Sequence, residues 1–433
     1  MLGLGLGVWP LGGGLSWLPV PPSGINPGLV LDFAGNRAFQ SGAQVALSST
    51  LAFTRATQAW DLQPDGSLVS VASGSPRYGG GLGFLPEGTR TNLLLQSGNF
   101  STSWGVSNTT VTPNAVAGVE QSGAVTAAST VLTAGGGGPA QTVTIGAATT
   151  NTISIYAKPF STNWLRIRLQ AGVDIKAVWF NLATGAVGTK DAVGTEITAI
   201  TTSMTAAANG FYRCIVTITT VTATSLVFTP VACAADNING AASDSCYLEK
   251  SQIELGATAT SYITTTTATA TRNADQMIIS GSPLTAGLSA TEGTFLIEAE
   301  FDSATPSNPH MGLGNTASPS INNRITCTFT PSGAQLAIVD SAVFQASTIV
   351  VAGNTRPIKT RFVARYKAND SASSTKGSAP SVDSVCTIPA GMDRFVVGSA
   401  PWAPGAAPLE GRISRVAFWP TGLINSDIQA LSA

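Results

Sequence analysis

Short stretches in which apolar and polar residues alternate are the main pattern along this chain of 433 residues. A period of two places alternate side chains on opposite faces of a strand, so each stretch predicts a strand with one face for a core. The clearest runs are Ile153, Ile155 and Ala157 among Thr152, Ser154 and Tyr156; Leu165, Ile167 and Leu169 around Arg166 and Arg168; and Phe295, Ile297, Ala299 and Phe301 around Glu298 and Glu300.

Turn signals separate these runs at short intervals, for example Asp65-Gly66 and Asn209-Gly210. The 3.6-residue period of an amphipathic helix is convincing only near the C-terminus. Many short strands joined by such turns are typical of sandwiches and jelly rolls. We therefore predict an all-β fold with two tandem, jelly-roll-like β-sandwich domains, preceded by an irregular N-terminal anchor.

Composition divides the chain into four regions. Residues 1–24 form an apolar segment rich in Gly, Trp and Pro, 25–95 a connecting region of short strands, 96–275 a first sandwich and 276–433 a second. Trp9 and Trp17 would expose large apolar surfaces on an isolated molecule, which favours docking of the first segment onto a larger assembly. A partly disordered N-terminus is the alternative.

Charge excludes some classes of protein. The chain has 22 Lys and Arg against 23 Asp and Glu, a net charge of -1, so no overall field attracts nucleic acid. Gly and Pro interrupt every apolar stretch before it reaches the length of a membrane span, and the N-terminus lacks the basic residues of a signal peptide. We expect neither membrane insertion nor secretion by such a signal.

Metal chemistry has few ligands to use. The five cysteines are widely spaced without a Cys-x-x-Cys pair, His310 is the single histidine and lies in a loop-like stretch, and no acidic cluster resembles a calcium site. We expect no metal and no cofactor, and buried thiols in a protein assembled in a reducing cytoplasm. A bridge between Cys233 and Cys246 stays an open alternative.

Two groups of residues are candidates for glycan binding. Trp164 precedes Arg166 and Arg168 on one strand face, and an aromatic ring beside charged hydrogen-bond donors suits a sugar. Lys359, Arg361 and Arg365 form a basic stripe that suits an acidic polysaccharide. The alternatives are a core position for the tryptophan and a solvated strand face for the stripe.

Catalysis has little support. Glycan hydrolysis needs two carboxylates across a cleft, and Glu298 and Glu300 instead share a strand face that we expect to be solvated. A Ser-His-Asp triad could use only His310. We expect a protein that is not an enzyme, with a polysaccharide-degrading activity as a minor hypothesis.

The chain resembles a family of phage virion proteins described as head spikes or tail-associated fibres with carbohydrate-binding-like modules. The match covers about residues 30–275 and is specific in order and spacing. The segments that carry it are LDFAGNRAF (31–39), LAFTRATQAW (51–60), PDGSLVSVASGSPRY (64–78), LGFLPEGTRTNLLLQSGNFSTSW (82–104), ISIYAKPF (153–160), VWFNLATGAVGT (178–189), NGFYRCIVT (209–217) and SQIELGATATSYITTT (251–266). Where family members often carry Trp and Gly, this chain has Glu249 and Lys250, a difference that we expect to affect a surface loop.

Two further resemblances concern the ends of the chain. The C-terminal region looks like a laminin-G or concanavalin-A-like sandwich, mainly through EGTFLIEAEF and the closing strand and helix. The N-terminus is similar in composition to those of phage and gene-transfer-agent proteins.

These resemblances imply a virion surface protein, a head spike or fibre, that is assembled in the bacterial host cytoplasm. Its N-terminus would bind other virion proteins of the capsid or tail, and its sandwiches would bind host-surface polysaccharide to aid adsorption. A homo-oligomer, either trimer or pentamer, is expected because symmetric copies add avidity. A purely structural capsid decoration or tail component without a ligand is the alternative. Head or tail location, the glycan and the symmetry stay open.

Overall fold

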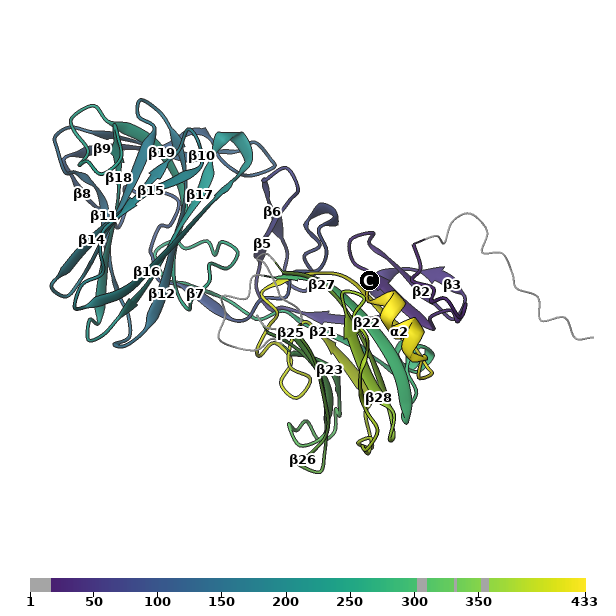
Figure 1. The fold of residues 1–433 in the computed structure, drawn as a ribbon. Helices are drawn as coiled ribbons and strands as arrows, with labels where there is room; N and C mark the ends of the chain where they lie inside the picture. Colours follow the sequence, from purple (N-terminus) through teal and green to yellow (C-terminus); the bar gives the residue numbers. More distant parts are fainter. Residues whose placement is uncertain (1–16, 302–309, 331–332, 352–357) are drawn as a thin grey trace, which may run out of the picture.

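The computed structural model describes residues 17–301, 310–330, 333–351 and 358–433. Two β-sandwiches are joined by a narrower junction (Figure 1). The prediction of an all-β chain with two sandwiches is confirmed for this part of the chain. Trp9 lies outside the described residues.

The first sandwich consists of two six-stranded antiparallel sheets, which we call the β12 sheet and the β13 sheet. The β12 sheet has the order β16 (Ile197–Ala206), β17 (Tyr212–Thr220), β12 (Thr150–Pro159), β19 (Ser245–Leu255), β10 (Val125–Leu132) and β9 (Thr109–Ala117). The β13 sheet has the order β15 (Ala186–Lys190), β14 (Asp174–Asn181), β13 (Trp164–Ala171), β18 (Ser225–Cys233), β11 (Gly138–Thr144) and β8 (Gly105–Ser107).

The predicted alternation determines which side chains fill this sandwich. Ile153 and Ile155 of β12 and Leu165 and Ile167 of β13 all belong to one buried cluster between the two sheets. Their polar neighbours consequently face away from the core, because side chains of a strand alternate between its faces. The outer faces of both sheets are therefore rich in hydroxyl and charged groups.

The second sandwich pairs an eight-stranded sheet with a seven-stranded one, called the β22 sheet and the β24 sheet. The β22 sheet has the order β29 (Ser381–Asp383), β28 (Ser371–Thr375), β27 (Ile358–Lys367), β22 (Glu292–Phe301), β31 (Gly411–Trp419), β1 (Leu29–Asp32), β2 (Arg37–Gln40) and β3 (Ala43–Val45). The β24 sheet has the order β26 (Val343–Val351), β25 (Gly333–Asp340), β24 (Arg324–Thr330), β23 (His310–Gly314), β30 (Arg394–Val397), β21 (Gln276–Ser280) and β4 (Ala52–Thr54). His310, expected in a loop, is the first residue of β23.

The first strands of the chain belong to this second sandwich, although residues 25–95 were predicted as a connecting region. β1 lies between β31 and β2, and β4 pairs with β21. All four residues of β1 are buried, because Leu29 and Leu31 face the core between the sheets and Val30 faces a second cluster on the outer side. The N-terminal strands thus complete a domain built mainly from the C-terminal third of the chain.

That outer cluster is covered by α2 (Asn425–Leu431) and by the first described residues. Ile428 of α2 packs in the same cluster as Leu18, and Trp17 packs against it, with the Arg37 guanidinium 4.2 Å from the Trp17 ring centroid. Trp17, a predicted virion anchor, therefore contacts its own second sandwich. The short helices α1 (Gly281–Gly287), η1 (Leu47–Ser49), η2 (Gly79–Gly81) and η3 (Ala208–Gly210) cap strand ends. None of the helices in the described segments is long and apolar enough to cross a membrane.

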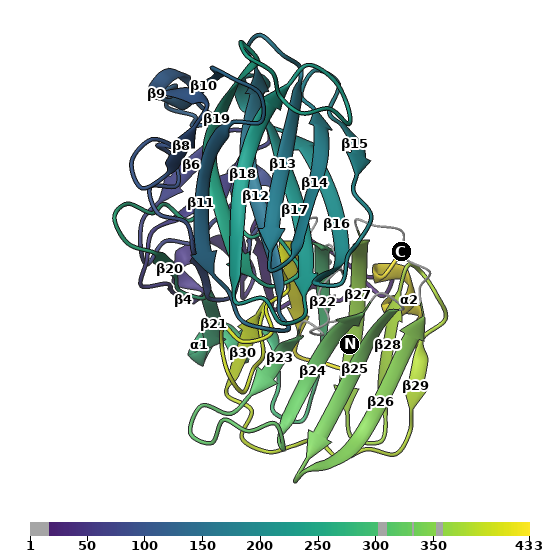
Figure 2. The same ribbon diagram turned by 90° about the vertical axis from the view of Figure 1, so that its left-hand side faces the viewer.

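The junction is made by two stretches, 55–104 and 256–275, through which the chain leaves the second sandwich and returns to it (Figures 1 and 2). Two small sheets form there, β5 (Ala59–Leu62) with β6 (Leu68–Val71), and β7 (Arg90–Asn92) with β20 (Ala270–Arg272). The β7–β20 pair links the outgoing and the returning stretch directly.

A buried ion network connects both stretches of the junction. Asp275 accepts hydrogen bonds from Arg77 and from Arg55, the latter at 2.9 Å. Glu87 accepts a hydrogen bond from Arg77 and forms an ion pair with Arg272 at 3.0 Å. None of these five side chains is more than 6% exposed. Three guanidinium groups thus share two carboxylates in a water-excluded site, where such groups are retained only if they are paired.

Candidate ligand-binding cleft between the two sandwiches

A cleft of about 550 Å³ lies between the β12 sheet and the junction. One side is formed by the outer faces of β16 and β17, and the other by residues 257–262 together with Glu410 and Arg412 of the second sandwich. The volume lies within the usual range for small-ligand sites, roughly 300–1,000 Å³. Both sandwiches therefore contribute to a single concave surface.

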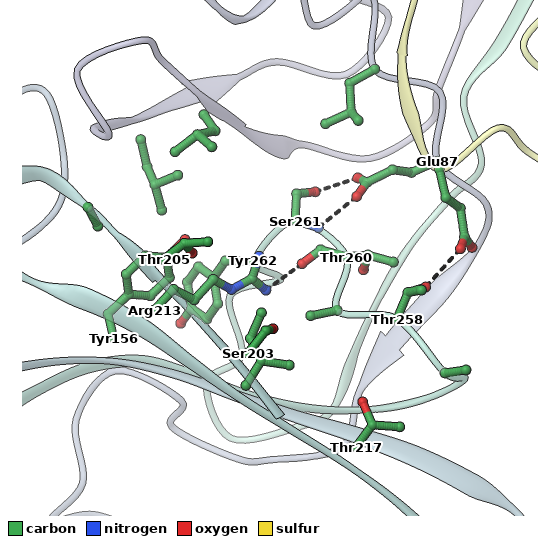
Figure 3. A pocket seen from close by; sticks show the side chains of 18 of the residues that line it. Glu87, Tyr156, Ser203, Thr205, Arg213, Thr217, Thr258, Thr260, Ser261 and Tyr262 are labelled. Carbon is green, nitrogen blue, oxygen red and sulfur yellow. Dashed lines mark hydrogen bonds between the residues drawn. The ribbon is translucent and has the colours of Figure 1, made fainter. Parts of the chain in front are cut away.

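Hydroxyl groups dominate the strand side of the cleft. Thr201, Ser203 and Thr205 of β16 are exposed on alternate positions, and Thr217 of β17 lies opposite Thr201 in the strand register. Figure 3 shows Ser203, Thr205 and Thr217 on the strands and the hydroxyl-bearing residues of the 257–262 loop beside them. This ladder follows from the period of two, because the same alternation that buries Ile200 and Val216 turns the hydroxyl side chains outward.

Tyr156 and Arg213 lie side by side in the lining of the cleft (Figure 3). The Arg213 guanidinium lies 5.6 Å from the ring centroid of Tyr156 and donates to the Thr260 carbonyl at 2.6 Å and to the Ser154 hydroxyl at 3.0 Å. Burial raises the pKa of Tyr156, so its phenol keeps its proton at neutral pH. An aromatic ring and a fixed cation therefore sit beside the hydroxyl ladder.

The two carboxylates that line the cleft are both held by partners. Glu87 accepts from the Ser261 backbone N–H at 2.7 Å and from its hydroxyl at 2.6 Å, and Glu410 accepts from Arg90 at 2.6 Å and from Thr258 at 2.8 Å. Burial alone would raise the pKa of Glu87, but the nearby arginines of the junction outweigh it and hold the pKa well below its usual value. These groups are thus arranged to fix the loop of residues 257–262.

A buried lysine, Lys250, contacts the loop of residues 257–262 through Tyr262. Glu249 and Lys250 were expected in a surface loop, and this expectation is wrong, because both are buried in β19. The Lys250 ammonium lies 2.7 Å from a Glu120 oxygen and 2.9 Å from a Glu249 oxygen, and 4.7 Å from the ring centroid of Trp60 and 5.4 Å from that of Tyr262. The difference from the family pattern therefore falls next to the cleft.

The predicted residues Trp164, Arg166 and Arg168 lie together on the opposite side of the first sandwich, on the outer face of the β13 sheet. Trp164 is half-buried beside Trp179, and the Arg166 guanidinium lies 5.4 Å from the Trp179 ring centroid. The Trp179 indole donates to the Ile238 carbonyl at 2.8 Å. The structure thus gathers these residues on one face and packs the tryptophans under a loop.

The predicted basic stripe lies on β27, where carboxylates of the next strand neutralise much of it. Lys359 pairs with Glu300 at 3.2 Å and Arg361 with Glu298 at 2.8 Å across the register of β27 and β22. Arg365 is buried, pairs with Asp370 and donates to the Leu423 carbonyl at 2.7 Å. Lys359 and Arg361 line a shallow hollow of about 640 Å³, whereas Arg365 stabilises the chain near α2.

Other expectations concern thiols and metals. All five cysteines, including Cys233 and Cys246, are buried free thiols. Cys246 belongs to the core of the first sandwich, and Cys233 lies in the small cluster outside the β13 sheet. Within the described ranges, no group of three or more His, Cys, Asp or Glu side chains could hold a metal ion.

Sequence reasoning missed the cleft. Its strand side carries a readable signal, since Thr201, Ser203 and Thr205 occupy alternate positions of one strand. The other side comes from residues of the outgoing stretch such as Leu85 and Glu87, from residues 257–262 of the returning stretch, and from Glu410 and Arg412. No local pattern indicates that these segments meet.

Comparisons with known proteins identify no family. No family model and no curated protein matches the chain. Among solved structures, a CBM40 module of the Ruminococcus gnavus IT-sialidase bound to α2,6-sialyllactose is 14% identical, with a TM-score of 0.26, over 34% of this chain and 85% of that one. The LG1–3 region of the laminin α2 chain is 12% identical, with a TM-score of 0.23, over 64% of this chain and 63% of that one. Domains LG4–5 of the mouse laminin α1 chain are 10% identical, with a TM-score of 0.20, over 81% and 90%. TM-scores this low carry no conclusion about function.

Proposed function

We propose that the protein is a non-enzymatic adhesin that binds host-surface polysaccharide in the cleft between its two sandwiches. The observation that carries the proposal is the combination, in one cavity of about 550 Å³, of the hydroxyl ladder with Tyr156 and Arg213. Sugars offer many hydroxyl groups, so they suit a surface of hydroxyl side chains beside a fixed guanidinium donor, which the buried Tyr156 ring supports. The size accommodates one or two sugar units of a longer chain.

Binding rather than hydrolysis is favoured by the state of the carboxylates. A glycosidase needs one carboxyl group that can donate a proton and a second that acts as base or nucleophile. Glu87 and Glu410 are occupied by arginine and hydroxyl partners, and the lowered pKa of Glu87 keeps it ionised. A polysaccharide-degrading activity would be revealed by the release of reducing ends.

For the biological setting, we propose a phage virion surface protein, a head spike or fibre, assembled in the host cytoplasm and attached through its N-terminal segment. The support is the resemblance of about residues 30–275 to such proteins and the apolar character of residues 1–24. A trimeric or pentameric assembly would add avidity to weak sugar contacts. Light scattering of the full chain tests the assembly, and a monomer would contradict it.

Adsorption of the full chain to host cells, with and without their surface polysaccharide, tests the function. We expect binding that is lost when the polysaccharide is stripped. Ser203→Trp places an indole in the cleft from edge strand β16 and is expected to abolish most of the binding. Ser107→Trp is the matched control, because Ser107 is also an exposed serine on an edge strand of the first sandwich.

Each result has a distinct meaning. Equal binding to stripped and intact cells would refute the adhesin and favour a structural decoration of the particle without a ligand. Polysaccharide-dependent binding that survives in Ser203→Trp would refute the cleft as its site. Melting curves of both variants must match that of the unchanged protein for these comparisons to hold.

A further inference from the structure

An arginine close to two aromatic rings lies on the outer face of the β24 sheet, apart from the cleft. The Arg324 guanidinium is 5.5 Å from the ring centroid of Phe344 and 5.2 Å from that of Trp402. Arg324 begins β24, Phe344 lies near the start of β26, and Trp402 belongs to the loop between β30 and β31. Three separate elements thus bring these side chains together.

The strand register explains why the group forms. Arg324 is opposite Val339 of β25, and Val339 is opposite Phe344. Directly paired residues place their side chains on the same face of a sheet, so the arginine, the valine and the phenylalanine form a row across β24, β25 and β26, which lie side by side in Figure 2. Val339, in the middle of this row, is buried.

The Arg324 guanidinium has no polar partner among the described residues. Its Nε atom is buried without a hydrogen bond, and partial burial lowers the pKa of Arg324 with no carboxylate acting against this. Arg394 and Arg365 of the second sandwich differ in their terminal nitrogens, which donate to the Pro401 carbonyl and to the Leu423 carbonyl, each at 2.7 Å. Desolvating a cation without a counter-charge is costly, and a bound anion would offset that cost.

The aromatic side of the group is open. Phe344 is 62% exposed and its neighbour Val343 58% exposed, although phenylalanine and valine are among the residues most often buried. Both residues belong to β26, which is the last strand of its sheet among the described residues, so no further strand pairs beside them. An exposed apolar ring therefore adjoins an unpaired planar cation.

We propose that Arg324, Phe344 and Trp402 form a second saccharide site, which binds a carboxylated sugar unit. The carboxylate would accept two parallel hydrogen bonds from the guanidinium fork, and the apolar face of the pyranose would cover the Phe344 ring. The Trp402 ring, 5.2 Å from the guanidinium, would help to hold it in place. The site lies on the second sandwich and does not depend on ligand binding in the cleft.

Saturation-transfer NMR on the full chain tests this site, because it detects the weak binding of single sugars. The probes are glucuronate, galacturonate and N-acetylneuraminate, each with its neutral, carboxyl-reduced counterpart. We expect transfer to at least one acid and none to its reduced form. Arg324→Met and Phe344→Ala should weaken that binding about tenfold or more, as the loss of a charged hydrogen bond implies.

Three further variants make the outcome decisive. Arg324→Lys keeps the charge without the planar fork and should also lose most of the binding. Lys190→Met, which removes an exposed cation of the first sandwich, and Ser107→Trp, the edge-strand control used above, should leave it unchanged. No transfer from any acid, equal transfer from an acid and its reduced counterpart, or equal transfer in Arg324→Met would overturn the proposal.

Discussion

Removing one charge from the junction network tests how the two sandwiches are held together. Asp275→Asn preserves the shape of the side chain and removes the negative charge that Arg55 and Arg77 share. Three guanidinium groups would then face Glu87 as the remaining carboxylate in a site with almost no exposure. The variant therefore creates uncompensated buried charge without creating a cavity.

The expected loss follows from the burial of the network. Breaking a buried ion pair by removing one partner costs about 3–5 kcal/mol. With an unfolding entropy of about 2.1 cal/mol/K per residue and a cooperative unit of roughly 200 residues, a loss of about 4 kcal/mol lowers Tm by about 10 °C. A Lys359→Ala control breaks the pair with Glu300, whose side chains are 74% and 46% exposed, and should lower Tm by less than about 2 °C.

Differential scanning calorimetry of the full chain measures both variants. Adding Arg55→Met to Asp275→Asn removes one of the unpaired cations and should recover part of the lost stability. The reasoning is refuted if Asp275→Asn melts within about 2 °C of the unchanged protein, as the exposed control does. It is also refuted if the double variant loses as much Tm as the two single variants together.

Three further outcomes are expected. The folded-state pKa of Glu87 lies below its ordinary value of 4.5, so the ionised Glu87 stabilises the folded protein fully above that pH and progressively less as the pH falls below it. Tm should therefore decline below about pH 4.5, and an unchanged Tm down to pH 3 would contradict this. All five cysteines are buried, and burial raises the pKa of Cys233 and of Cys246 to about 12. Because burial blocks access to each thiol, Ellman's reagent at pH 8 should detect no thiol in the folded protein and five after unfolding; a fast-reacting native thiol is the contrary result. Trp164→Ala should cost about 2 kcal/mol of stability, since the side chain is half-buried beside Trp179, and should leave adsorption to host cells unchanged; weaker adsorption by the folded variant would return the glycan site to the β13 sheet.

Local patterns predicted the strands and their faces. Ile153 and Leu165 fill the core as the alternation requires, and Phe362 and Ala364 of β27 are buried while Lys359 on the opposite face is exposed. A period of two is a property of neighbouring residues, so it survives without knowledge of the rest of the fold.

Features that depend on distant segments were not predictable in this way. The pairing of Leu29 with Phe418 brings the two ends of the chain into one sheet, and nothing in either stretch specifies the other. Nothing in the sequence indicated that the basic stripe has acidic partners, because Lys359 and Glu300 are far apart along the chain. The strand register places them side by side. The cleft needs both sandwiches, so its position follows from the junction rather than from any motif.

Hydrogen–deuterium exchange of the full chain, with and without purified host polysaccharide, is the most direct test of the central claim. The account predicts slower exchange in 197–206, in 212–220 and in the loop of residues 257–262, which together line the cleft. Polysaccharide that protects only other surfaces, or that changes no exchange rate at concentrations that saturate cell adsorption, would contradict it.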